Sequence, residues 1–389
     1  MKAKGADPSA SKGVAAAVIA AALALVLTAC GGGTPGPPPP CGNPLPSPEP
    51  SGWAGDPGAI ASDVASGLIP PYYVAVEKYG GYAWVRTTAT GVTLATIQAP
   101  TADADLVAAS ASSDDRTFVL ETEPHGYEYG GPRQERGFYL FHLSSSGRPG
   151  ALRRLPVSIP STGTMIGIAL SPDADRLAVL TTSPSTDSAD PYVQIQEFDI
   201  EVYTLATGAV RTWTANGPAG LSLTDGETTL AWTQDERTLS FPWTAGSKAR
   251  LLSLDAPGGN LLTASRPALI GSGQAWTCSE LGIPLITPDG KTLACAAYPT
   301  ADSTDQVVGI AEYNAADGVL ERVLGRHLSV PEGALLSWEN TSGSVVIGSI
   351  EGPFQSCPTA LPPTVGVFTG SRFVALPEVP AWFDGNSVW

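Results

Sequence analysis

Short apolar segments alternate with short polar turns along most of this chain. One arrangement recurs five times: an apolar segment, a tight polar turn and a second apolar segment. The turns, called the Asp turns below, begin at Ser112, Ser171, Thr233, Thr287 and, in a looser copy, Glu339, and they are 52 to 62 residues apart. Pro presets φ for such a turn, and Asp bonds the backbone that follows it. The pattern therefore predicts a β-hairpin at each Asp turn.

A second kind of turn, called the Gly turn below, lies between the Asp turns. Glycine supplies the positive φ that tight reversals between strands require. Three clear copies are Thr88–Val92, Leu205–Val210 and Ala315–Leu320, and poorer copies are marked by Gly147, Gly258 and Gly370. Helical periodicity is confined to one short segment, Ala59–Leu68.

Each repeat therefore holds two hairpins, or four short antiparallel strands. Repeats of this length with four strands are typical of β-propeller blades. The predicted fold class is an all-β propeller with six four-stranded blades, and seven blades are the alternative.

The two ends of the predicted propeller are expected to meet. The first repeat begins with three apolar strands, Tyr72–Val76, Ala83–Arg86 and Val92–Ile97, and no inner strand precedes them. The tail Ala381–Trp389 resembles the inner strand and turn of the other repeats. We expect this tail to add the missing strand, because an added strand satisfies an open sheet edge.

The segment Thr287-Pro288-Asp289-Gly290-Lys291-Thr292-Leu293-Ala294 resembles the repeat of WD40-like, TolB-type propellers, and Leu170–Val179 is similar. The resemblance covers about five repeats. It implies a propeller scaffold that usually serves protein interaction, and it transfers no catalytic residue. The glycine of the repeat is missing from most copies.

The N-terminus has the features of an export signal. Lys2, Lys4 and Lys12 precede an unbroken apolar run, Val14–Leu27, which is typical of a secretory leader. Leu27-Thr28-Ala29-Cys30 then resembles the lipobox of bacterial lipoproteins, which implies cleavage before Cys30 and lipid on its sulfur. An ordinary signal peptide is one alternative. A membrane anchor is another, although the run has 14 residues and a span needs about 20.

These features divide the chain into three parts. Residues 1–29 are the expected lipoprotein signal peptide, 30–56 the lipidated cysteine with a Pro-rich linker, and 57–389 the propeller domain. Nine prolines between positions 34 and 50 favour an extended spacer. The predicted location is extracytoplasmic, with the protein held at the bacterial cell membrane by lipid on Cys30.

The charge of the chain restricts its partners. The formal net charge is −16, and the part after residue 29 carries 18 basic and 36 acidic side chains. A field of this sign repels nucleic acid, so nucleic acid is not an expected partner.

Four cysteines remain besides Cys30. In an exported chain an even number is typical of two disulfides. The favoured pairs are Cys278–Cys295, which are close in sequence, and Cys41–Cys357, which would fix the linker to the domain. Free buried thiols are the alternative.

Long connections are expected on the face opposite the Asp and Gly turns, and binding sites usually lie in such loops. The loop Glu123–Gly137 is the richest, because it combines aromatic, charged and histidine side chains. Trp276, in a segment expected to link two blades, would line the same face. The candidate binding residues are His125, Tyr127, Tyr129, Arg133, Arg136 and Trp276. The alternatives are a solvated hairpin for the loop and core packing for Trp276.

The sequence contains no zinc-protease, nucleophile-elbow or phosphate-loop motif. No catalytic residue, metal site or cofactor is therefore assigned. The first functional hypothesis is a tethered propeller whose long-loop face binds a protein or an envelope glycan. The alternative is an extracytoplasmic hydrolase or lyase with its site at the central channel.

Overall fold

The computed structural model describes the chain in segments. The described residues are 57–76, 81–124, 136–159, 164–184, 195–218, 230–243, 249–270, 275–278, 284–300, 309–324, 334–338, 345–350, 364–369, 372–375 and 387–388. Several predictions concern residues outside the described ones: the leader, Cys30, the linker, Cys41 and Cys357. The predicted turns at 339–344 and Gly370 also lie outside the described residues.

The described strands form six sheets, here numbered in chain order. Sheet 1 contains β26 (Ser387–Val388), β1 (Tyr72–Val76), β2 (Tyr82–Thr87) and β3 (Thr93–Gln98). Sheet 2 contains β4 (Ala104–Ala111), β5 (Thr117–Pro124), β6 (Gly137–His142) and β7 (Arg153–Arg154). Sheet 3 contains β8 (Thr164–Leu170), β9 (Arg176–Pro184), β10 (Ile195–Thr204), β11 (Val210–Pro218) and β15 (Gly259–Asn260).

The other three sheets come from the second half of the chain. Sheet 4 contains β12 (Ala231–Trp232), β13 (Thr238–Pro242), β14 (Ala249–Ser253) and β16 (Ser265–Pro267). Sheet 5 contains β17 (Trp276–Cys278), β18 (Leu285–Ile286), β19 (Thr292–Pro299), β20 (Gly309–Asn314) and β21 (Leu320–Leu324). Sheet 6 contains β22 (Ala334–Trp338), β23 (Val345–Ile350), β24 (Thr364–Thr369) and β25 (Arg372–Ala375). The helices among the described residues are α2 (Pro57–Ala65) and α3 (Leu261–Ala264).

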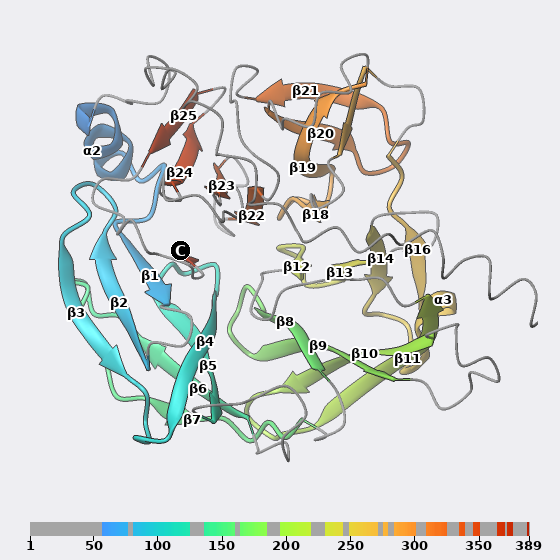
Figure 1. Ribbon diagram of the computed structural model, residues 1–389, viewed down its shortest axis with the longest axis horizontal. Coiled ribbons are helices and arrows are strands. Elements are labelled where there is room, and N and C mark those ends of the chain that lie inside the picture. The colour runs from blue at the N-terminus through green and yellow to red at the C-terminus, as the bar shows by residue number, and fades with distance from the viewer. Residues whose placement is uncertain are drawn as a thin grey trace, which may run out of the picture. The chain divides into compact units, whose positions relative to one another are not determined.

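The fold is a β-propeller. The sheets stand around a common centre, and each contains antiparallel strands that mostly follow chain order (Figure 1). The core lies between neighbouring sheets: one cluster of buried side chains joins sheets 1 and 2, a second joins sheets 2 and 3, and a third joins sheets 3 and 4. Sheets 3 and 5 have five strands each, which differs from the four expected.

The Asp turns connect the first and second strands of their sheets, as the sequence predicts. In the four described copies the Asp Oδ1 accepts the hydroxyl of the residue two before it, from Ser112, Ser171, Thr233 or Thr287. Oδ1 also accepts a backbone N–H that follows, for example that of Asp175 at 2.9 Å. The Oδ1 atom of Asp173 is thus used by its own turn.

The fourth position of the Asp turn requires positive φ. Asp115, Ala174 and Glu236 have φ of 55°, 59° and 57°, and Gly290 has φ of 74°. The copies without glycine therefore keep the same backbone at a cost of about 1 kcal/mol or more for a residue with a Cβ.

Gly290→Ala is expected to lower the free energy of unfolding by about 1 kcal/mol, because it places a Cβ on a left-handed backbone. That Cβ would also lie 3.2 Å from Cγ2 of Thr233. Ala174→Gly is the matched change and should have the opposite sign, about 0.5 kcal/mol of stabilisation after the entropy of the unfolded glycine is deducted. Urea unfolding of the two variants checks this, and a shift of the same sign in both would contradict it.

Hydrogen bonds connect each described Asp turn to the next. Ser113 donates from N and Oγ to the Pro172 carbonyl, at 3.1 and 2.8 Å. The Glu236 carboxylate accepts the Asp173 N–H at 2.9 Å and pairs with Arg176. Gln234 N donates to the Pro288 carbonyl at 2.6 Å. The turns therefore fix sheets 2 to 5 to one another at one end.

The C-terminal tail closes onto the first sheet, as the sequence predicts. β26 pairs antiparallel with β1, with Val388 opposite Val74 and Ser387 opposite Ala75. The last of the described strands is therefore the first strand of sheet 1.

One Gly turn departs from the repeat. Gly91, Gly147, Gly208 and Gly318 all have positive φ in short turns, but Gly258 lies in a longer connection between β14 and β16. This connection adds β15 in parallel to β11 of sheet 3 and then forms α3. The prediction of a tight turn at Gly258 was wrong because residues 254–264 are an insertion that packs on the neighbouring sheet.

The inner strand of sheet 5 is split. β17 pairs with the C-terminal half of β19 and β18 pairs with its N-terminal half. Cys278 in β17 forms the predicted disulfide with Cys295 in β19, and both cysteines are buried.

Replacing both Cys278 and Cys295 by Ala is expected to lower the free energy of unfolding by about 3 kcal/mol. The bond closes a loop of 17 residues, and a loop of that size loses about 3 kcal/mol of unfolded-state entropy when closed. Denaturant unfolding measures the loss. An unfolding midpoint equal to that of the wild type would show that the disulfide between β17 and β19 does not contribute to stability.

Candidate functional site

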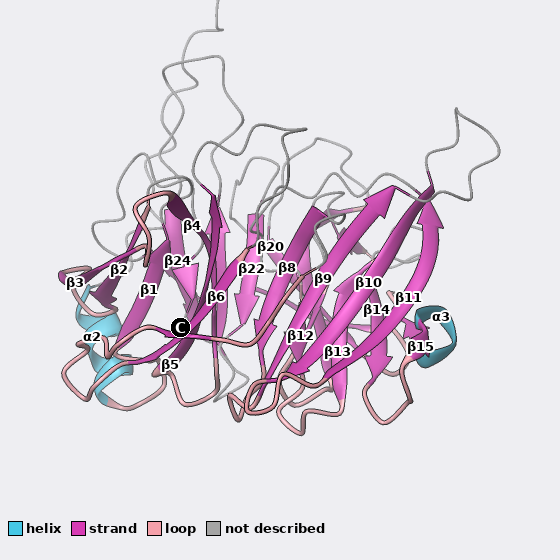
Figure 2. Ribbon diagram, turned by 90° about the horizontal axis from the view of Figure 1, so that it is seen from below, coloured by secondary structure: helices cyan, strands magenta, loops and turns pink. Residues whose placement is uncertain are grey.

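The described second strands end, and the third strands begin, at the end of the sheets opposite the Asp and Gly turns, because the strands alternate in direction. The short described turns gather at the lower end in Figure 2. Four of the candidate binding residues, His125, Tyr127, Tyr129 and Arg133, belong to the β5–β6 connection and lie outside the described residues.

Arg136 forms the described end of this connection. Its guanidinium pairs with Glu121 and lies 3.4 Å from Glu123, both on β5. The side chains are 14%, 0% and 7% exposed respectively. A Cβ at the next residue, Gly137, would lie 2.6 Å from Oγ1 of Thr122, so a larger residue at this position would force a neighbouring side chain to move. The loop therefore leaves the sheet from a closely packed, ion-paired base, and the described contacts of Arg136 point inward.

Trp276 lies in the inner strand β17 rather than in a link between blades, which corrects the sequence prediction. It is partly buried against a cluster that contains both disulfide cysteines and Tyr313. Its carbonyl accepts the Tyr313 hydroxyl at 2.9 Å, and burial raises the pKa of that hydroxyl to about 12. The half-strand escaped sequence analysis because three residues carry too little periodicity to be recognised.

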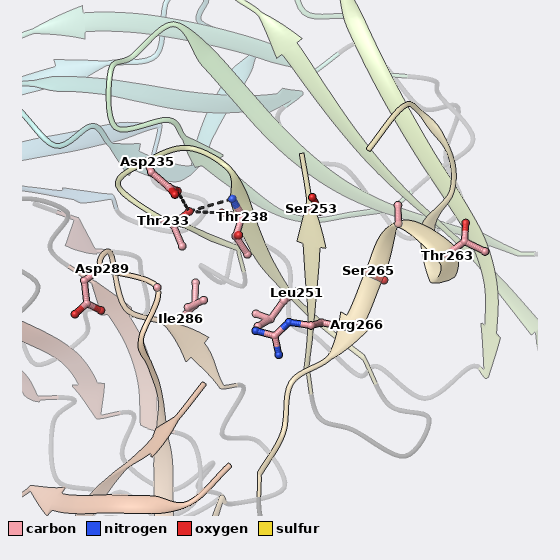
Figure 3. A pocket seen from close by; sticks show the side chains of 12 residues that line it. Thr233, Asp235, Thr238, Leu251, Ser253, Thr263, Ser265, Arg266, Ile286 and Asp289 are labelled. Atoms are coloured by element: carbon pink, nitrogen blue, oxygen red, sulfur yellow. Dashed lines mark hydrogen bonds between the residues drawn. The ribbon is translucent and has the colours of Figure 1, made fainter. Parts of the chain in front are cut away.

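A polar pocket of about 450 Å³ lies between sheets 4 and 5, beside the Asp turns (Figure 3). Asp235 belongs to the turn of sheet 4 and Asp289 to the turn of sheet 5, while Arg266 extends into the pocket from β16 on the other side. The hydroxyls of Thr238 and Ser253 line it as well, and the buried side chains of Leu251 and Ile286 form its apolar part.

The carboxylates of the pocket are held ionised by their turns. Hydrogen bonds from the Thr233 hydroxyl and the Arg237 N–H lower the pKa of Asp235. Burial acts to raise the pKa of Asp289, but hydrogen bonds from the Lys291 N–H and the Thr287 hydroxyl outweigh it and lower the pKa.

The outer wall of the pocket is the insertion that breaks the repeat. Thr263 and Ala264 of α3 line the pocket, and the Asn260 side chain caps α3 by accepting the N–H groups of Leu262 and Thr263. The insertion is bound to β11, because Trp213 Nε1 donates to the Pro257 carbonyl at 2.9 Å and Arg211 donates to the Leu254 carbonyl at 2.6 Å. The pocket wall is therefore fixed to sheet 3 as well.

Sequence analysis missed this pocket. The signal that could have found it is the long interval between the apolar strands Arg250–Leu254 and Arg266–Ile270, where the other repeats have a tight turn. Among the described residues, no three His, Cys, Asp or Glu side chains are grouped so as to hold a metal ion. No described helix is both long and apolar enough to cross a membrane.

No protein-family model and no curated protein sequence matches this chain. Solved structures similar to it include a protein of unknown function from Bacteroides caccae, with a TM-score of 0.47, 12% identity, and coverage of 82% of this chain and 98% of that one. Oligogalacturonate lyase from Vibrio parahaemolyticus has a TM-score of 0.43, 14% identity and 80% coverage of each chain. The propeller domain of the Trilobed protease from Pyrococcus furiosus has a TM-score of 0.32, 9% identity, and coverage of 57% and 59%. The strand pairing described above defines the fold of this chain.

Proposed function

We propose that this protein is a lipid-tethered, extracytoplasmic binding module, a closed six-bladed propeller whose blades present the long loops to a protein or an envelope glycan. The observation that carries the binding role is the base of the 125–135 connection. Arg136 follows this connection directly and pairs with Glu121 and Glu123 on β5, so the C-terminal end of the loop is fixed to a rigid strand. Loops held by a rigid scaffold are where binding residues concentrate.

The composition of this connection supports recognition. It contains Tyr127, Tyr129 and Arg133 within seven positions. Tyr and Arg are enriched among residues that dominate binding energy, because they combine a large contact area with hydrogen bonding. The acidic charge of the chain favours a partner that is neutral or basic at its contact surface.

A photo-crosslinking residue at position 127 tests the binding role in cell envelopes. The matched control position is Ala206, which is exposed in the Gly turn between β10 and β11, at the opposite end of the sheets. We expect a discrete crosslinked species from position 127 and none from position 206. Its yield should fall when Tyr129 and Arg133 are both replaced by Ala. Equal yields from the two positions would contradict a role for the long-loop face.

The tether is tested separately. Cys30→Ala should release the protein from the membrane fraction, since acyl chains on this sulfur are its proposed anchor. Mass spectrometry of the wild-type N-terminal peptide should find a lipid-modified cysteine. Membrane retention of the Cys30→Ala variant, with an unmodified sulfur in the wild type, would reject the lipoprotein assignment and leave the binding role to be judged by the crosslinks.

A further inference from the structure

We propose that the pocket between sheets 4 and 5 is a second binding site, at the end of the sheets that carries the Asp turns, and that it takes a small neutral polyhydroxy compound, a mono- or disaccharide. This inference does not depend on the proposed function of the loop face. The volume of the pocket, about 450 Å³, is in the range of small-molecule sites, about 300 to 1,000 Å³.

The pocket offers both hydrogen-bond donors and acceptors. Arg266 uses Nη1 to reach the Ala315 carbonyl of sheet 5, at 3.1 Å, and its remaining N–H groups are not bonded to described residues. The hydroxyls of Thr238 and Ser253 make no hydrogen bond within the described part of the chain. In Asp235 and Asp289 the bonds that hold the turn go to Oδ1, so Oδ2 has the capacity to accept a hydroxyl.

Local charge favours a neutral ligand. Each acidic side chain here has a basic neighbour: Asp289 Oδ2 lies 3.6 Å from Lys291 Nζ, and Arg237 pairs with Asp255 beside Asp235. The pocket itself is lined by two acidic side chains, Asp235 and Asp289, and one basic side chain, Arg266. A ligand with a net charge would gain little from this arrangement. A ligand with several hydroxyls can bond to carboxylate and guanidinium groups at once.

The shape of the pocket is set before a ligand binds. The Asp turns form one wall and are hydrogen-bonded to each other through Gln234 and Pro288. The capped helix α3 forms another and is held to β11 through Trp213. Two buried apolar side chains, Leu251 and Ile286, line the pocket together with the polar groups. Pre-formed sites of this kind lose less entropy on binding.

Titration calorimetry on the full chain tests the proposal with D-glucose, D-galactose, N-acetyl-D-glucosamine and trehalose as neutral probes, and with D-galacturonate as a charged one. Saturable binding of at least one neutral probe is expected, with a Kd between micromolar and millimolar. Arg266→Ala should weaken it about tenfold, because one hydrogen bond to a charged group is lost. Ser253→Trp should abolish it by filling the pocket.

Arg153→Ala is the matched control. Arg153 lies on the outer strand of sheet 2, opposite Leu140 of the neighbouring strand. Arg266 lies in the same way on the outer strand of sheet 4, opposite Leu251, and both arginines are exposed. This variant should bind as the wild type does. If Ser253→Trp folds poorly, the isosteric change Thr238→Val serves in its place. It should also reduce the affinity for the neutral probe, because it removes a hydroxyl of the pocket. The proposal is overturned if no neutral probe binds, if only a charged probe binds, or if Arg153→Ala weakens binding as much as Arg266→Ala.

Discussion

Deletion of residues 380–389 is expected to lower the free energy of unfolding by about 4 kcal/mol. The deletion removes β26, whose two residues pair with Val74 and Ala75 of β1. Each ladder hydrogen bond that is lost with this pairing contributes about 1 kcal/mol. The rest comes from renewed exposure of β1, whose side chains from Tyr73 to Val76 are at most 3% exposed, because burying one Val side chain contributes about 1.5 kcal/mol or more.

The matched control is a deletion of ten residues from the Pro-rich linker, 37–46, which should leave thermal unfolding unchanged. Circular dichroism melts of the two truncated chains provide the measurement. The same melting temperature for the C-terminal truncation and the wild type would mean that the β1–β26 pair does not hold the propeller closed.

The regular part of this fold could be predicted because its signals are local. An Asp turn needs Ser or Thr, then Asp two residues later, and these bonds form within six residues of chain. The predicted short helix was found as α2, with Ile60 buried. The closing strand followed from a strand count, since the first repeat lacks an inner strand and the tail supplies one.

The irregular part depends on contacts between repeats. The insertion before Ser265 forms β15 only because β11 of the preceding sheet offers a free edge. The split inner strand of sheet 5 depends on the Cys278–Cys295 bond and on pairing with β19. The pocket brings together Asp235 and Asp289 from consecutive turns. Spacing in one sequence shows that such residues occupy equivalent turns, but not that a cavity lies between them.

Trp232→Ala is expected to lower the free energy of unfolding by about 4 kcal/mol, as large-to-small changes of a buried tryptophan do. Trp232 is 2% exposed, and its Nε1 donates to the Ala169 carbonyl of sheet 3 at 3.0 Å. The guanidinium of Arg176 lies 5.1 Å from the centre of the Trp232 ring and also pairs with Glu236. The Arg176 side chain therefore makes two contacts between sheets 3 and 4. Trp232→Phe keeps most of the bulk and removes the donor, and should cost about 1 to 2 kcal/mol. Urea unfolding separates the contribution of the buried ring from that of the indole hydrogen bond. Equal losses of unfolding free energy in both variants would assign the stabilisation to the hydrogen bond. A loss near zero in Trp232→Ala would show that sheets 3 and 4 are held together by their turns alone.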